Sequence, residues 1–144
     1  MVDGFFSDIY VLVEHRKVDV VNEFLECFVP DNQELADEYE IPQYSDNPEI
    51  IFRKATELMH YCETNVEAAH SIYWFNNQRE DPRNAMVFYT NDGKMILGLS
   101  IAYKSQEREW LTKLKQFLQS EHACILYESP PPENSADFKK LIQK

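Results

Sequence analysis

Hydrophobic and polar positions repeat with two different periods along the chain, and these periods predict where strands and helices lie. Residues 8–13 form a β-branched and aromatic run that is apolar on both faces, which predicts a central strand. Residues 17–28 instead carry apolar side chains at helical spacing, from Val18 to Phe28, which predicts a helix. Pro30 ends that helix, because the residue before a proline avoids helical geometry.

A second helix is predicted to begin at Asp46 or Asn47, either of which would cap it, with Pro48 at the first helical position. It would run to about residue 63, and its buried stripe would comprise Ile51, Ala55, Leu58, Met59 and Cys62. The preceding segment, residues 29–46, has no clear period, and only a short helix around residues 34–38 is expected there. A connection of this length is longer than most in compact domains, which makes it a candidate for function.

Three further strands are predicted in the middle of the chain, at residues 70–76, 85–90 and 94–102. Asn91-Asp-Gly93 separates the last two and is a strong hairpin signal. Residues 94–102 are apolar on both faces, so this strand should be central. Gly98 inside it predicts a bulge or a close side-chain neighbour.

The C-terminal part predicts a helix, a strand and a closing helix. Ser105 would cap a helix that runs to about Gln119, and residues 124–127 would form the last strand. Because a helix separates this strand from the one before it, the two could be parallel through a right-handed crossover. Pro130-Pro-Pro132 forces an extended break, and Ser135 would cap the closing helix.

These elements predict one α+β domain over residues 1–144, in the order β-α-α-β-β-β-α-β-α. We expect a single mixed, largely antiparallel sheet of about five strands, with helices packed mainly on one face. Residues 29–46 would form an insertion-like acidic loop. If the helices cover one face only, either the Tyr73 side or the Trp74 side of its strand stays open, and exposed aromatic side chains suit a contact surface.

Acidic side chains are concentrated in the first half of the chain. The net charge is -11, and residues 1–70 hold 16 acidic and 4 basic side chains, whereas residues 71–144 hold 9 and 10. From Asp31 to Glu49 there are carboxylates but no lysine or arginine. This charge disfavours nucleic acid as a partner and would steer a basic protein toward the surface. The alternative interpretation is a solvated loop that only keeps the protein soluble.

The N-terminus and the cysteines indicate the compartment. Residues 1–8 lack the basic stretch and apolar core of a signal peptide, and no run of apolar residues is long enough to span a membrane. Cys27, Cys62 and Cys124 are isolated and odd in number, which favours reduced thiols over a disulfide framework. We therefore expect a cytoplasmic protein that does not contact a membrane.

The sequence contains no signature of a catalytic or metal site. The histidines, His15, His60, His70 and His122, have no zinc-ligand spacing with one another or with a cysteine. Only 3 glycines are present, and none forms a phosphate-binding loop. The acidic run 37–40 lacks the ligand spacing and turn glycine of an EF-hand. We therefore expect no catalytic residue, no metal and no cofactor.

Tyrosines accompany the carboxylates of the acidic segment, because Tyr39 and Tyr44 flank Ile41-Pro42. Tyrosine beside carboxylates supplies an interface with both anchor groups and charge. We therefore predict a partner-binding surface made by Glu34, Asp37, Glu38, Tyr39, Glu40, Ile41, Tyr44, Asp46 and Trp74. The partner would be a basic protein, and the chain itself would be a monomer or a weak homodimer.

Three stretches carry a family resemblance: His70-Ser-Ile-Tyr-Trp74, Ala85-Met-Val-Phe-Tyr-Thr-Asn-Asp-Gly-Lys-Met-Ile-Leu-Gly-Leu-Ser100, and the acidic stretch before Asn47. With them the chain resembles the small, acidic α+β immunity proteins of bacterial toxin–antitoxin-like competition systems. The resemblance implies a cytosolic inhibitor that neutralises a basic toxin domain by binding it in a fixed ratio. It implies no catalytic residues.

Two other functions remain open at this level. One is a small-molecule-binding regulatory domain that uses the open sheet face or a cleft beneath the acidic segment. The other is a hydrolase or transferase that uses His15, His70 or His122 with a carboxylate. The second requires two of these groups to meet within hydrogen-bond reach in a concave site.

Overall fold

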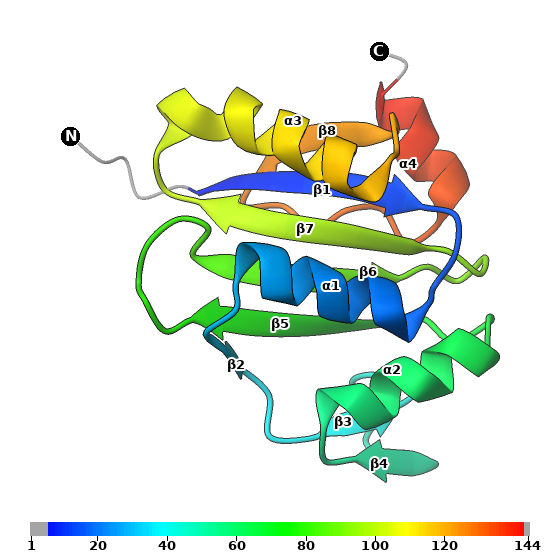
Figure 1. Ribbon diagram of the computed structural model, residues 1–144. Coiled ribbons are helices and arrows are strands. Elements are labelled where there is room, and N and C mark those ends of the chain that lie inside the picture. The colour runs from blue at the N-terminus through cyan, green and yellow to red at the C-terminus, as the bar shows by residue number, and fades with distance from the viewer. Residues whose placement is uncertain (1–5, 143–144) are drawn as a thin grey trace.

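The computed structural model describes residues 6–142, which fold around a six-stranded sheet in the order β2-β5-β6-β7-β1-β8 (Figure 1). Every neighbouring pair in this sheet is antiparallel. Its strands are β1 (Ser7–Val13), β2 (Asn32–Glu34), β5 (His70–Asn76), β6 (Asn84–Tyr89), β7 (Met95–Ile101) and β8 (Ala123–Tyr127). Two more strands, β3 (Tyr39–Ile41) and β4 (Ile50–Phe52), form a small antiparallel sheet of their own.

The helices lie on both sides of the sheet, three on one side and one on the other (Figure 1). They are α1 (Val18–Phe28), α2 (Ala55–Thr64), α3 (Glu107–Leu118) and α4 (Ser135–Ile142), with a short 3-10 turn, η1 (Lys104–Gln106), before α3. The first three cover one face and α4 packs on the other. This arrangement confirms the predicted α+β class and the packing of helices mainly on one face.

Strand alternation sorts the side chains of β1 between two apolar layers. Ile9 and Val11 pack into the layer beneath α1, α2 and α3. Tyr10 and Leu12 point the opposite way and pack with Phe138 of α4. We call this second side of the sheet the open face, because α4 covers only part of it.

The sheet differs from the prediction in strand number and pairing. The main sheet has six strands rather than about five, because β2 of the acidic segment joins it. β3 and β4 form a second sheet in or next to that segment, where no strand was expected. No helix forms around residues 34–38. β7 and β8 run in the same direction, but β1 lies between them and pairs with both.

The second helix begins later than Asn47-Pro48 predicts. Residues 50–52 pair with residues 39–41 as β4 and β3, so Ile51 lies on an exposed strand position. α2 starts at Ala55, where the Glu57 side chain accepts hydrogen bonds from the backbone amides of Arg53 and Lys54. The pairing of β4 with β3 has therefore replaced the capping signal at Asn47-Pro48.

Both glycines that the sequence singles out have a clear role. Gly93 has a φ of 90° in the hairpin between β6 and β7, a conformation that favours glycine. Gly98 pairs with Tyr10 in an unbroken ladder, and a Cβ at position 98 would lie 2.7 Å from the Tyr10 ring. Of the two predicted reasons for Gly98, the close neighbour is therefore confirmed.

The N-terminal residues on which the signal-peptide expectation depends lie mostly outside the described part of the chain, which begins at Phe6. Within residues 6–142, none of the helices has both the length and the apolar character needed to cross a membrane.

Candidate partner-binding groove

The open face carries a groove whose two walls come from segments distant in sequence. One wall is residues 128–133, which follow β8 and which we call the proline strap. The other wall is formed by Leu35 and residues 42–44. We call it the acidic wall because it belongs to the acidic segment, although these four side chains are not acidic themselves. Between the walls lie two hollows of about 320 Å³ and about 540 Å³, and both are lined by Tyr73 and Pro130.

Hydrogen bonds hold the proline strap at both ends. Near β8, the hydroxyl of Tyr10 donates to the carbonyl of Ser129 at 2.9 Å, and the Ser129 amide donates to Asp8 at 3.2 Å. At the other end, the amide of Asn91 in the β6–β7 hairpin donates to the carbonyl of Glu133 at 3.0 Å. The prolines between these anchors favour an extended chain, so this wall has a defined position.

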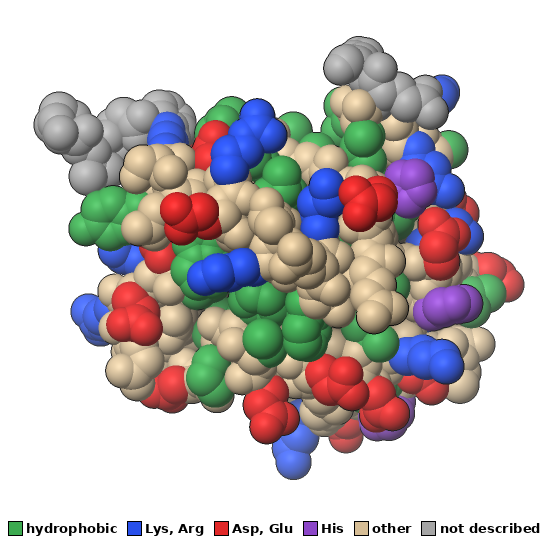
Figure 2. All heavy atoms as spheres, turned by 45° about the horizontal axis from the view of Figure 1, so that its top comes forward, with side chains coloured by type: hydrophobic (Ala, Val, Ile, Leu, Met, Phe, Trp, Pro, Cys, Tyr) green, Lys and Arg blue, Asp and Glu red, His purple; other side chains and the backbone are tan. Residues whose placement is uncertain are grey.

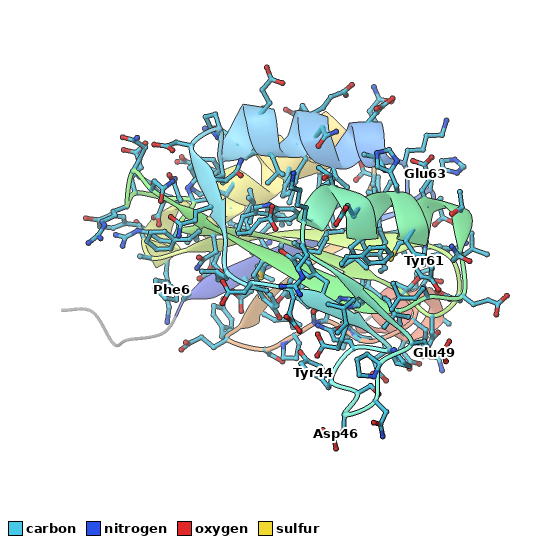
Figure 3. All side chains as sticks on the ribbon, turned by 90° about the horizontal axis from the view of Figure 1, so that it is seen from below. Phe6, Tyr44, Asp46, Glu49, Tyr61 and Glu63 are labelled. Carbon is cyan, nitrogen blue, oxygen red and sulfur yellow. The ribbon has the colours of Figure 1, made fainter. Side chains whose placement is uncertain are left out.

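The acidic wall is attached to β5 and ends in an exposed tyrosine. The Gln43 side chain donates to the Ser71 hydroxyl at 2.9 Å. Tyr44 is 80% exposed and has a φ of 67°, which is uncommon for a residue with a side chain. Figure 3 shows Tyr44 and Asp46 on a loop that projects on the side of the sheet opposite α1. An exposed ring on a strained backbone adds little to folding, which favours a role in contact.

Aromatic side chains form the floor of the groove. The Tyr73 and Phe88 rings meet edge to face at 5.7 Å, and the Phe88 and Tyr10 rings do so at 5.8 Å. Tyr73 is 37% exposed, whereas Trp74 on the other side of β5 is 2% exposed. The Tyr73 side of the strand is therefore the open one.

A buried carboxylate lies in the smaller hollow, which we call the Asp8 hollow. The strand register places Asp8, Ser100 and Asn84 in one row across β1, β7 and β6. Asp8 is 6% exposed, and the Ser100 hydroxyl donates to its Oδ1 at 2.5 Å. Burial raises the pKa of the Asp8 carboxyl, and the hydrogen bonds from Ser100 and Ser129 partly oppose that shift.

The charged groups along the groove are carboxylates. Asp8, Glu128 and Glu133 line the two hollows, and no lysine or arginine is among the described residues that line them. Within residues 6–142, Asp8 takes part in no ion pair, and Glu128 raises its pKa further. Figure 2 shows that the helix-covered side instead mixes basic and acidic side chains. The groove is therefore suited to a cationic ligand.

His70 lines the larger hollow but has no free ring nitrogen. The Ser71 amide donates to Nδ1 at 2.9 Å, so Nε2 carries the hydrogen and donates to the carbonyl of Glu40 at 2.8 Å. The ring thus attaches the acidic segment to β5. His15 and His122 are exposed. The described residues contain no group of three histidine, cysteine or acidic side chains that could hold a metal ion.

Some side chains of the predicted contact surface point inward. Tyr39 and Trp74 are each 2% exposed, and Ile41 packs against the same core. Glu34 accepts hydrogen bonds from the Tyr39 hydroxyl at 2.8 Å and from the Ala55 amide at 3.0 Å. These residues hold the β3–β4 sheet and the start of α2 in place, so a partner cannot reach Tyr39 or Trp74.

The rest of the predicted surface faces outward. Asp37, Glu38 and Asp46 are exposed, and the Glu40 side chain accepts a hydrogen bond from the Tyr44 amide at 3.0 Å. Within residues 6–142, one ion pair involves residues 29–46, between Glu38 and Arg53 at 3.9 Å, and both side chains are exposed. Ion pairs between exposed side chains contribute little to stability, so these carboxylates remain available to a partner.

Two parts of the groove were not predicted. Asp8 was only the first residue of a predicted strand, and the one available signal was a carboxylate next to an apolar run. The proline run predicted an extended break, but nothing in the sequence placed it across the open face. Both depend on contacts between segments distant in sequence.

No family model, no curated protein and no solved structure matches this chain. The groove is therefore the main support for a function.

Proposed function

We propose that this protein is a non-enzymatic binding domain that captures and inhibits a basic protein, as an immunity protein does. The observation that carries the proposal is the groove itself. Its hollows are lined by aromatic rings, prolines and carboxylates without lysine or arginine, and an exposed Tyr44 stands at its edge. An extended cationic segment of the partner fits this chemistry.

Binding would proceed in two steps. The exposed carboxylates of the acidic segment first attract the basic partner, which raises the rate of encounter. The side chains of Tyr44, Tyr73 and Pro130 then become buried as the cationic segment binds between the two walls. Aromatic anchors of this kind supply most of the affinity in protein interfaces.

The first experiment uses the immobilised protein and an extract of its native cell, with mass spectrometry to identify what is retained. Y44G removes the exposed ring and relieves the backbone strain at that position. Y103A is its matched control, because Tyr103 is 65% exposed and lines neither hollow. We expect a basic protein that is retained by the wild type and by Y103A and lost with Y44G. Equal retention by both variants would contradict the proposal.

The second experiment separates local charge from total charge. D46N/E49Q neutralises two exposed carboxylates near Tyr44, and E23Q/E26Q neutralises two exposed carboxylates on α1. Both variants lose the same formal charge. With the retained protein as probe, the association rate should fall about tenfold between low and high salt for the wild type. At low salt, the association rate of D46N/E49Q should be lower than that of the wild type, whereas the rate of E23Q/E26Q should be unchanged. An equal effect of the two variants would exclude steering by the acidic segment.

A small-molecule ligand is the second candidate, because the two hollows, about 320 and 540 Å³, have the volume of ligand pockets. A thermal-shift screen of metabolites tests it, since a ligand that binds only the folded state raises the melting temperature. A large shift that Y44G abolishes would support this function, and uniformly small shifts would remove it.

A further inference from the structure

We infer that the Asp8 hollow is a binding site for the guanidinium group of one arginine side chain. The inference rests on the proposed function in one respect, because it takes the arginine to belong to the cationic segment of a protein partner. The site itself is defined by groups on β1, β6, β7 and the proline strap.

The hydrogen bonds of Asp8 leave part of its acceptor capacity open. A carboxylate offers about four lone-pair sites, two on each oxygen. Oδ1 accepts a bond from the Ser100 hydroxyl and Oδ2 accepts one from the Ser129 amide, and the backbone of Glu128 also contributes a hydrogen bond that lowers the pKa of Asp8. An acceptor site therefore remains for an N–H group of a guanidinium, and a hydrogen bond to this charged donor is stronger than one to a neutral donor.

The surroundings favour a planar cation over a compact one. Tyr73 and Phe6 contribute ring surface to the hollow, and Pro130 contributes an apolar wall. A guanidinium stacks on such surfaces, whereas the more strongly hydrated ammonium of lysine gains less. Glu128 adds a second carboxylate to the lining of the hollow.

Asp8 anchors the proline strap and accepts the Ser100 hydroxyl, but no basic side chain within residues 6–142 balances its charge. A buried acid without a cationic partner destabilises the protein, because burial penalises its charged form. Within residues 6–142, the titratable groups that interact with Asp8 are Glu128, Tyr10 and Tyr73, and none of them supplies a positive charge. A perturbed acid in a concave site is typical of a binding position.

The experiment is an NMR titration of the isotope-labelled full chain with N-acetyl-arginine amide, its citrulline analogue and its lysine analogue. Citrulline keeps the shape of arginine but carries no charge. We expect saturable shifts at Tyr73, Asn84 and Ser100 with the arginine compound, at a Kd of about 1 mM, as for a single side chain. The citrulline and lysine compounds should bind at least about tenfold and about fivefold more weakly. Equal binding of the arginine and citrulline compounds would overturn the inference.

Two variants complete the test. D8N keeps the acceptor for Ser100 but removes the charge, so it should weaken binding of the arginine compound about tenfold or more. D137N, at an exposed position on α4, should leave it unchanged. Unaltered binding by D8N, or shifts confined to the Tyr44 side of the groove, would contradict the inference.

Further measurements distinguish an arginine side chain of a protein from free arginine as the ligand, and they test the arginine site and the proposed function separately. Free L-arginine should bind more weakly than the blocked compound, since its α-carboxylate is repelled by Glu128, and tighter binding would contradict a protein side chain as the ligand. If the basic partner binds D8N as well as wild type but not Y44G, the arginine site is wrong and the proposed function stands. If the arginine compound binds while no basic protein is retained, the site stands and the proposed function fails.

Discussion

The ring of Tyr10 lies directly against Gly98, so that a Cβ at position 98 would meet the Tyr10 Cδ1 at 2.7 Å and the Met86 Cε at 3.1 Å. Glycine at this position leaves room for the ring, whose hydroxyl donates to the carbonyl of Ser129. The absence of a side chain at Gly98 on β7 therefore helps to position the proline strap that follows β8.

We expect G98A to lower the free energy of unfolding by about 1–3 kcal/mol, because the added methyl group overpacks the Tyr10 ring. Urea denaturation measures the change. The same substitution in a Y10V background is the control, since the smaller side chain leaves room for the methyl group. An equal loss in both backgrounds would mean that the ring is not the cause.

Arg16 is the second site where one side chain connects distant segments. Its guanidinium donates to the carbonyls of Cys62, Asn65, Ala68, Thr90 and Lys94. We expect R16K to lower the free energy of unfolding by about 2–4 kcal/mol, because an ammonium cannot reach both groups of buried carbonyls. R108K, on the exposed side of α3, should change it by less than about 0.5 kcal/mol, and similar losses in the two variants would refute this role.

Removal of two buried tyrosine hydroxyls should change the free energy of unfolding in opposite directions. Within residues 6–142, the buried Tyr89 hydroxyl has no hydrogen-bond partner, and burial raises its pKa. The Tyr10 hydroxyl instead donates to the carbonyl of Ser129. We expect Y89F to raise the free energy of unfolding by about 1 kcal/mol and Y10F to lower it by about 1 kcal/mol. Chemical denaturation of both variants checks this, and a loss of stability in Y89F would show that its hydroxyl has a partner.

Tyr44 and Tyr39 should differ in their contributions to stability. Y44G should leave the free energy of unfolding within about 1 kcal/mol of wild type, because relief of the left-handed backbone offsets the added freedom of glycine. Y39A should lower it by about 3–5 kcal/mol, because the ring is buried. A large loss of stability in Y44G would show that this ring supports the fold.

Asp8 should make the protein less stable as pH rises. Its folded-state pKa is raised, so between the unfolded and folded values the native state binds more protons than the unfolded state. Stability therefore falls as pH rises through that interval, relative to D8N, which has no such carboxyl. Thermal melts of both proteins across mildly acidic pH measure the difference, and parallel pH profiles would mean that the carboxyl titrates normally.

Binding of a cation beside Asp8 should have the opposite pH dependence. The neutral form of the carboxyl does not attract a guanidinium, so affinity should increase as pH rises through the pKa of Asp8 in the free protein.

The long elements were predictable because their periodicity is local. The strand at residues 8–13 and the helix at 17–28 follow from side-chain spacing alone, and the hairpin follows from Asn91-Asp-Gly93. The start of α2 was not predictable, because the pairing of residues 50–52 with residues 39–41 overrides the signal of Pro48. Strands of three residues, such as β3 and β4, are too short to show a clear alternation in a single sequence.

Of the predicted contact residues, Tyr44 lines the larger hollow, whereas the carboxylates that line the hollows, Asp8, Glu128 and Glu133, were not among the predicted ones. The acidic composition around Tyr44 indicated a surface for a basic partner, and the carboxylates there do face outward. Tyr39 and Tyr44 could not be told apart, since burial depends on how β3 packs against the core. Asp8 was missed because desolvation of a carboxyl is a property of the folded chain.

The two walls of the groove are attached very differently. The proline strap is bonded to the sheet and to the β6–β7 hairpin, whereas the acidic wall meets the sheet through the three residues of β2 and through Ser71 and His70. The proline strap is thus attached near its two ends, to β1 and to the β6–β7 hairpin, whereas the acidic wall is attached to β5. The two sides of the groove can therefore be altered separately by substitution, one through β5 and the other through β1 and the β6–β7 hairpin.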